Sequence, residues 1–359
     1  MLSMITMEGR PEEIGMAHGT QFKEQIHRAY QELCQFGDIL SAKRKVVLVK
    51  RYLDHVSATF PDLLEEMQGI ALGAEMSLES IGELTLWEEL KALAMDPQDG
   101  VPHGCTSVCF LNTPDGTVVG KTTDIEDFQR PYYVLQHLVP QNGYRLIGLG
   151  KIGSTKIEVG LNEKGLCIAT GSLAPLEQDV DGIERMTLVR LALERCSNVD
   201  EAITFISRHH LIRLGLYFLL ADPIKACVIE KSTIHQGFRF PSHQGTLFAT
   251  NFYLTPHMAP LMNRNAFYYQ NALERYANLS ILVETGLPAQ GLSGMKTLLR
   301  NHSALGPVCA HFNDLGMCSF YACIILPQTL RFLLADGFPC QTEFQAFSIQ
   351  VHHHPQEGF

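Results

Sequence analysis

One cysteine in the sequence stands in a setting that favours nucleophilic chemistry. Cys105 follows Gly104 and begins an apolar, β-branched run in the segment HGCTSVCFL. A glycine at that position permits unusual backbone angles and leaves its carbonyl group open to attack. If the bond between the two residues were cut, Cys105 would carry both a thiol and an α-amine with a pKa of about 7.7–8.0, which can act as the thiol's general base. The tripeptide Gly-Cys-Thr alone is more typical of a structural cysteine.

Such a nucleophile needs two further groups. A carboxylate must orient the amine, and hydrogen-bond donors must stabilise the oxyanion of a tetrahedral intermediate. The carboxylate and the donors must come from elements that fold next to residue 105. The predicted helices and strands therefore show which segments could supply them.

The segment before Cys105 is predicted to be helical. Apolar residues recur at helical spacing in four runs, at 11–36, 44–56, 61–74 and 78–94. Pro11 and Pro61 are expected to open the first and third runs, and Ser77 to cap the fourth. The Pro-, Gly- and Asp-rich stretch at 95–104 predicts a loop.

Strand-like runs dominate after this loop. Turns at 114–116, 141–143 and 162–165 separate pairs of alternating, β-branched runs, which predicts hairpins and an antiparallel sheet. Helical runs at 184–195 and 199–207, then at 264–283 and 291–301, alternate with further strands. This order lacks regular βαβ alternation, so it predicts an α+β fold with helices packed on antiparallel sheets.

Composition excludes several classes of protein. The 359 residues carry a formal net charge of −10, with 46% hydrophobic and 18% charged residues, which is typical of a folded chain and unfavourable for nucleic-acid binding. No apolar run is long enough for a membrane span, and the opening residues lack a signal-peptide pattern, so a cytoplasmic protein is expected. The ten cysteines contain no CxxC pair, so neither a metal site nor a redox dithiol is predicted.

Two other patterns are interpreted as structural. Gly148, Gly150 and Gly153 match GxGxxG, but a strand-like run follows where a dinucleotide loop needs a helix. A glycine-rich turn is therefore predicted. The tract His352–His354 is interpreted as a solvated tail.

The segments around Cys105 resemble the acyl-coenzyme A:6-aminopenicillanic-acid acyltransferase family of self-processing N-terminal-nucleophile hydrolases. The resemblance extends over nearly the whole chain, and the similar segments are 9–19, 61–73, 103–107, 160–166, 249–252 and 301–311. It implies a four-layer αββα sandwich, with cleavage between Gly104 and Cys105. The segments 1–104 and 105–359 would then be an α and a β chain that remain together as one domain and as a heterodimer.

The resemblance also implies roles for single residues. Cys105 matches the nucleophile, Asp124 the active-site aspartate, and Asn251 the oxyanion asparagine, whose side-chain N–H would point at the developing charge. Glu126 and Asp127 are close to Asp124, so that assignment depends on spacing alone. Lys121 stands where the related choloylglycine hydrolases and acid ceramidases have an arginine, and it either favours the thiolate or is merely exposed.

One departure from the family concerns an arginine. The penicillin enzyme has a Ser-Arg pair before its late strand, whereas the matching stretch 316–319 has no arginine. The substrate is therefore expected to differ. Arg275 is a possible replacement, although its position in a helical run favours a helix-surface residue.

These features together predict a self-cleaving cysteine enzyme. It would take an acyl group from an amide or an acyl-coenzyme A thioester and pass it to water or an amine, with no cofactor. A pure linear-amide amidase like the choloylglycine hydrolases and a catalytically idle binding protein are the alternatives. Consumption of a coenzyme A thioester would separate the first two.

Overall fold

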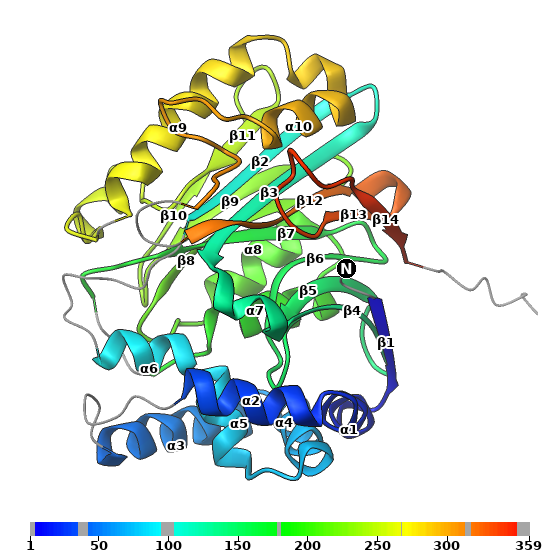
Figure 1. Cartoon of the computed structure of the whole chain (residues 1–359), viewed down its shortest axis with the longest axis vertical. Coiled ribbons are helices and arrows are strands. Elements are labelled where there is room, and N and C mark those ends of the chain that lie inside the picture. Colours follow the sequence, from blue (N-terminus) through cyan, green and yellow to red (C-terminus); the bar gives the residue numbers. More distant parts are fainter. Residues whose placement is uncertain are drawn as a thin grey trace, which may run out of the picture.

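The chain forms a four-layer sandwich in the computed structural model, which describes residues 4–34, 42–94, 104–177, 181–266, 268–312 and 317–349. Two sheets pack face to face, and helices cover the outer face of each (Figure 1). The predicted α+β, αββα architecture is therefore confirmed. Residues 95–103 of the predicted loop at 95–104 and the tract at 352–354 lie outside the described residues, and Gly104 is the first residue of a strand.

The larger sheet has eight strands in the order β1-β4-β5-β6-β7-β8-β9-β10. Apart from β1, which pairs parallel with β4, neighbouring strands are antiparallel. Their bounds are β1 Met4–Gly9, β4 Tyr133–Pro140, β5 Leu146–Lys151, β6 Ile157–Asn162, β7 Cys167–Leu173, β8 Gly215–Ala221, β9 Ala226–Lys231 and β10 Gln236–Arg239. Strand β1 was not predicted, because an edge strand this short depends on its partner more than on its own pattern. The GxGxxG segment lies in β5 and the turn before β6, which confirms the interpretation as a turn.

The smaller sheet has six antiparallel strands in the order β11-β2-β3-β12-β13-β14. Their bounds are β11 Thr246–Ala249, β2 Gly104–Thr113, β3 Gly116–Glu126, β12 Met317–Leu326, β13 Arg331–Ala335 and β14 Gln345–Ser348. The short strands β11 and β14 were not predicted. The predicted turn between β2 and β3 ends at Gly116, whose φ of 79° is a conformation that glycine adopts without strain.

Side-chain alternation along the strands divides the core into three parts. Alternate residues of a strand face opposite sides of its sheet. In β7, Ile168 packs with the helices of the first layer, whereas Cys167 and Ala169 pack between the two sheets. In β2, Phe110 packs with the outer helices, whereas Cys105 packs between the sheets. The predicted nucleophile thus belongs to the central layer of the core.

Helices from two parts of the chain cover the eight-stranded sheet. They are α1 Pro11–Gln21, α2 Lys23–Leu33, α3 Ala42–Thr59, α4 Pro61–Ala74, α5 Leu78–Thr85, α6 Trp87–Ala94, α7 Arg185–Arg195 and α8 Val199–Ser207. The predicted starts at Pro11 and Pro61 are confirmed, and Ser77 caps α5 by accepting a hydrogen bond of 3.1 Å from the N–H of Ser80. The predicted run at 11–36 is broken at Phe22 into α1 and α2.

Glycines bring α1 and α4 into backbone contact. A Cβ atom at Gly15 would lie 2.0 Å from the carbonyl oxygen of Glu66, and one at Gly69 would lie 2.3 Å from that of Glu12. The close approach therefore requires glycine on both helices. Segments 9–19 and 61–73, which carry part of the family resemblance, are the two sides of this contact.

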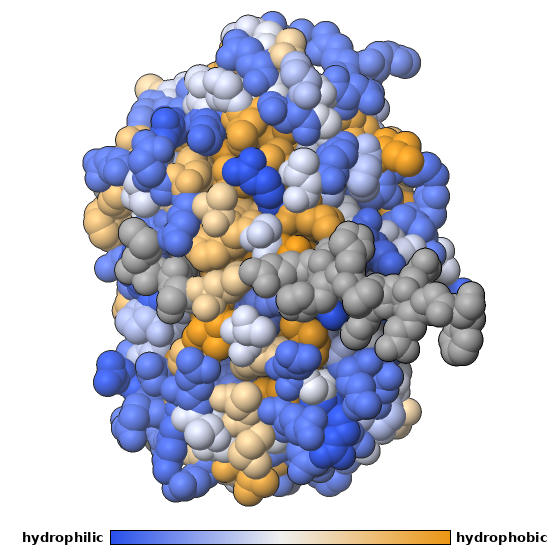
Figure 2. All heavy atoms as spheres, turned by 90° about the vertical axis from the view of Figure 1, so that its right-hand side faces the viewer, coloured by the Kyte–Doolittle hydropathy of each residue, from blue (hydrophilic) through white to orange (hydrophobic). Residues whose placement is uncertain are grey.

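Two helices cover the six-stranded sheet, α9 Tyr269–Glu284 and α10 Gly291–Leu299. Helix α9 begins later than the prediction at 264. Among the described residues, no helix is long and apolar enough to cross a membrane. Hydrophilic side chains occupy most of the face in Figure 2, and apolar ones gather along its middle from top to bottom.

Candidate active site

The β2–β3 pair places Cys105 and Asp124 at the same end of the six-stranded sheet. Gly104 is the register partner of Asp124, and Cys105 is that of Thr123. A Cβ atom at Gly104 would lie 2.7 Å from Oδ2 of Asp124. The carboxylate is therefore packed against the residue whose peptide bond is predicted to break, and a larger residue at 104 would displace it.

The Asp124 carboxyl group is buried and held in place. Ser319 of β12 donates a hydrogen bond of 2.6 Å from its hydroxyl to Oδ1 of Asp124. Burial raises the pKa of Asp124 to about 6, although Arg275 and the Ser319 hydroxyl act in the opposite direction. A carboxyl group with this pKa can both accept and donate a proton near neutral pH.

The two carboxylates that follow Asp124 in the sequence do not contact Gly104 or Cys105 in the described interactions. Glu126 pairs with Lys91 at 3.3 Å, and Asp127 is exposed and pairs with Arg130 at 3.2 Å. Spacing alone did not distinguish these residues from Asp124. The β2–β3 register does, because it brings only Asp124 of the three opposite Gly104.

Asn251 contacts the Cys105 peptide on the side away from Asp124's strand. The N–H of Cys105 donates to Oδ1 of Asn251 at 2.6 Å, and Nδ2 of Asn251 donates to the carbonyl oxygen of Ser172 at 2.9 Å. The side-chain oxygen of Asn251, and not its N–H group, therefore faces the Cys105 peptide in this structure, and the contact of that N–H with a developing oxyanion stays a prediction. The physical reason is that the buried peptide N–H of Cys105 needs an acceptor.

Arg275 is a residue of the site rather than of a helix surface, which corrects the sequence interpretation. Its side chain is fully buried, and Nη1 donates to the carbonyl oxygen of Cys105 at 2.5 Å and to Oγ1 of Thr106 at 3.0 Å. Nη2 donates to Oδ1 of Asn251 at 2.8 Å. The helical pattern of α9 could not reveal this, because it does not show which face lies over β2.

Lys121 is fully buried, so the alternative of an exposed lysine is wrong. Its Nζ lies 3.1 Å from Oε1 of Glu158 and donates to the carbonyl oxygen of Thr170 at 2.6 Å. Burial disfavours its charge, but interactions with Cys105 and Glu158 prevail and raise the pKa of Lys121. Burial also raises the pKa of the Cys105 thiol, and the charge of Lys121 opposes that shift.

Glu158 is a second residue that the sequence analysis missed. It accepts hydrogen bonds from Thr123 Oγ1 at 2.7 Å and from the Tyr133 hydroxyl at 3.2 Å, in addition to its ion pair with Lys121. Strict alternation in the run TKIEVGL would place Glu158 on the face opposite Val159 and Leu161, and the irregular pairing of β5 with β6 at this point is what a single sequence does not show.

Comparison with known proteins decides the family. The family model described as acyl-coenzyme A:6-aminopenicillanic acid acyl-transferase matches residues 111–305, more than half of the chain. The chain belongs to this family. The matched range includes Lys121, Asp124, Asn251 and Arg275, and it begins six residues after Cys105.

Individual proteins are similar to this chain over roughly two thirds of its length. The acyl-coenzyme A:6-aminopenicillanic-acid-acyltransferase 40 kDa form of Emericella nidulans is 25% identical over 256 residues, which cover 70% of each chain. Among solved structures, a Caenorhabditis elegans ortholog of N-acylethanolamine-hydrolyzing acid amidase is 14% identical, with a TM-score of 0.45 over 68% of this chain and 100% of that one. Penicillin V acylase from Agrobacterium tumefaciens is 11% identical, with a TM-score of 0.42 over 65% and 83% of the two chains.

Proposed function

We propose that the chain cuts itself between Gly104 and Cys105 and then uses Cys105 to take an acyl group from an amide or an acyl-coenzyme A thioester. One observation carries the proposal: three side chains from separate parts of the fold converge on residues 104 and 105. Asn251 and Arg275 bind the N–H and carbonyl groups of Cys105, and Asp124 packs against Gly104. A purely structural cysteine also needs partners for its backbone N–H and carbonyl groups, but it does not need a buried arginine and a buried carboxyl group beside them.

Self-cleavage would begin with attack of the Cys105 thiol on the carbonyl carbon of Gly104. A C–S bond forms, the C–N bond breaks, and the thiol proton ends on the released amine. Water then breaks the thioester, which leaves a carboxylate at Gly104 and restores the thiol. We assign the proton transfer from sulfur to nitrogen to Asp124, because its carboxyl group packs against Gly104 and has a pKa of about 6.

The released amine would then serve the second reaction. It takes the thiol proton as Cys105 attacks an acyl carbonyl, and it returns that proton to the leaving amine or thiol. Lys121 supports the thiolate through its positive charge. We assign oxyanion stabilisation to the Asn251 side-chain N–H, which becomes available if cleavage lets the side chain reorient.

Buried ion pairs support the expectation that segments 1–104 and 105–359 remain one domain after cleavage. Arg185 donates to Oε2 of Glu88 at 2.7 Å, and Lys151 donates to Oε1 of Glu88 at 3.0 Å, all within the interior. Separation of the two segments would leave these charges without their partners, which is strongly unfavourable.

Trapping the acyl-enzyme tests the activity and its rivals. The purified protein is mixed with a panel of linear amides and acyl-coenzyme A thioesters, and the fragment that contains Cys105 is weighed. We expect an acyl adduct on Cys105 in the wild type and none in Cys105→Ala. Adducts from amides alone would favour the pure amidase, and no adduct from any donor would favour the idle binding protein. Release of free coenzyme A identifies thioester consumption.

A further inference from the structure

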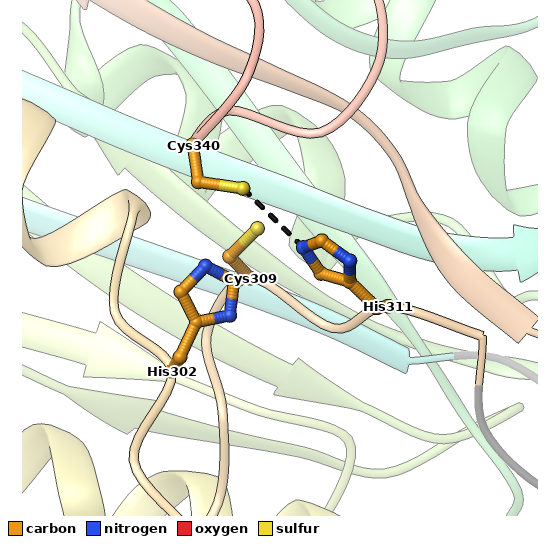
Figure 3. Close-up of side chains that lie close together, drawn as sticks. All are labelled: His302, Cys309, His311 and Cys340. Atoms are coloured by element: carbon orange, nitrogen blue, oxygen red, sulfur yellow. Dashed lines mark hydrogen bonds between the residues drawn. The ribbon is translucent and has the colours of Figure 1, made fainter.

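Four side chains outside the candidate active site converge between two loops. His302, Cys309 and His311 come from the segment between α10 and β12, and Cys340 comes from the segment after β13 (Figure 3). Their ligand atoms all lie within 4.8 Å of one another. The side chains turn toward a shared space, although 38 positions separate His302 from Cys340 in the sequence.

We propose that His302, Cys309, His311 and Cys340 bind one Zn²⁺ ion in a structural site. Two thiolates and two imidazoles are a donor set that zinc takes in tetrahedral structural sites. Calcium and magnesium prefer oxygen ligands, and none of these four residues supplies one. The proposal does not depend on the proposed function, and it departs from the sequence prediction that the chain has no metal site.

The distances are close to those of a zinc site. With Zn–S bonds of about 2.3 Å and Zn–N bonds of about 2.0–2.1 Å, the ligand atoms of a tetrahedral site lie about 3.3–3.8 Å apart. Nε2 of His311 and Sγ of Cys340 are already 3.3 Å apart. The widest pair would have to close by roughly 1 Å, which a side-chain rotation can supply.

Contacts around the cluster hold the ligands in place. The N–H groups of Val308 and Cys309 both donate to the carbonyl oxygen of Asn301, at 3.1 and 3.0 Å, which closes the loop that carries His302 and Cys309. The His311 ring stacks on Phe338, with centroids 4.3 Å apart and planes 6° apart, which fixes its direction. Surrounding contacts of this kind orient metal ligands and increase their affinity.

The second loop is tied to the first by the side chain of Arg300. Nε of Arg300, directly after α10, donates to the carbonyl oxygen of Pro339 at 2.8 Å. Cys340 is therefore held next to the segment with the other three ligands. His302 and His311 are exposed, so an ion can enter from solvent.

The cluster is linked to the candidate active site through Ala310, between two of the ligands. Its N–H donates to Oγ of Ser319 at 2.8 Å, and Ser319 donates from its own N–H to the Ala310 carbonyl oxygen at 2.8 Å. Ser319 also holds Asp124. A bound ion would therefore stabilise the loop that positions the hydroxyl group beside Asp124.

A metal-loading experiment tests the site. The full chain is purified with a reductant, stripped with a chelator, and titrated with Zn²⁺ or Co²⁺. We expect one ion per chain, a rise in Tm with Zn²⁺, and tetrahedral Co²⁺ absorption with a sulfur-to-cobalt charge-transfer band. His302→Ala should lower the zinc affinity at least about tenfold, and Cys340→Ser should weaken the charge-transfer band. Both positions are at least partly exposed, so folding should survive, and circular dichroism checks this.

Two control variants make the result specific. His243→Ala removes an exposed histidine far along the chain, and His353→Ala interrupts the C-terminal tract. Both should bind zinc like the wild type. Equal affinity in the wild type and His302→Ala, loss of binding in His353→Ala, or a Cys309–Cys340 disulfide in a protein that takes up no metal after reduction would each overturn the proposal.

Discussion

Asp124 and Asp127 are three positions apart but differ in burial and in the groups that they contact. Asp124 is buried against Gly104, and Asp127 is exposed beside Arg130. Asp124→Asn should lower turnover by about 10²- to 10⁴-fold, because the α-amine that acts as general base loses the carboxylate that orients it. Asp127→Asn should leave turnover nearly unchanged. The rates are measured on the cleaved fraction with the donor that labels Cys105. Equal losses in both variants would contradict the role of Asp124.

Asn251 offers a second test at the scale of one residue. One oxyanion donor contributes roughly 2.7–4 kcal/mol, so Asn251→Ala should slow the chemical step about 10²- to 10³-fold with little change in substrate binding. Single-turnover kinetics on the cleaved protein separate the two effects. Alkylation of Cys105 by iodoacetamide forms no oxyanion, so its rate should hardly change. Near-normal turnover in the cleaved variant would remove Asn251 from the mechanism.

At the scale of elements, a substitution in the contact between α1 and α4 tests whether that contact requires glycine. Gly69→Ala would place a Cβ atom 2.3 Å from the carbonyl oxygen of Glu12, so the helices must separate. We expect a loss of about 1–3 kcal/mol in the free energy of unfolding, which outweighs the roughly 0.5–1 kcal/mol that alanine adds to a helix. Urea unfolding in a Cys105→Ala background measures it. The exposed neighbour Gln68→Ala is the control, and stabilisation by Gly69→Ala would refute the packing argument.

His18 makes the attachment of α1 to the eight-stranded sheet sensitive to pH. The N–H of Gly153, in the turn after β5, donates to Nε2 of His18 at 2.9 Å, so the ring must be neutral. Burial lowers the pKa of His18 from 6.5 to about 4. Between pH 4 and 6.5 the unfolded chain therefore binds more protons at His18 than the folded chain does. The contribution of neutral His18 to the free energy of unfolding is fully present above pH 6.5 and is lost as the pH falls toward 4. The full loss is about 3 kcal/mol.

A glutamine at position 18 separates this effect from general acid unfolding. His18→Gln can still accept from Gly153 but does not titrate. The difference in unfolding free energy between wild type and His18→Gln should therefore shift in favour of the variant between about pH 6.5 and 4. Urea unfolding at several pH values measures this shift. Parallel pH profiles would show that His18 is not responsible.

At the scale of the whole molecule, self-cleavage should give two chains that stay together. Residues 1–104 and 105–359 should separate in a denaturing gel and elute as one species in size exclusion, because buried ion pairs such as Arg185–Glu88 cross between them. Cys105→Ala should remain one chain of 359 residues. A wild type that stays intact yet turns over substrate would disprove the N-terminal-nucleophile mechanism.

The sequence alone determined most helices and hairpin strands of this protein and part of its candidate site, whereas the four layers followed from the family resemblance. Helical periodicity, proline starts and turn glycines are local properties, so the helices and the hairpin strands could be predicted without tertiary contacts. The spacing from Cys105 to Asp124 was informative because the two residues lie on paired strands, where register converts sequence distance into spatial distance. The edge strand β1 and the short strands β11 and β14 were missed because they depend on their partners.

Only the tertiary structure decided which distant residues meet. Arg275 has the local pattern of a surface helix residue, yet it binds the Cys105 carbonyl because α9 lies over β2. Glu158 became part of the site because its strand faces β3 across the central core. The cluster of His302, Cys309, His311 and Cys340 was not predicted because its two loops meet only after β12 and β13 have paired. Such contacts depend on the packing of whole elements, and that packing leaves no periodic or spacing signal in a single sequence.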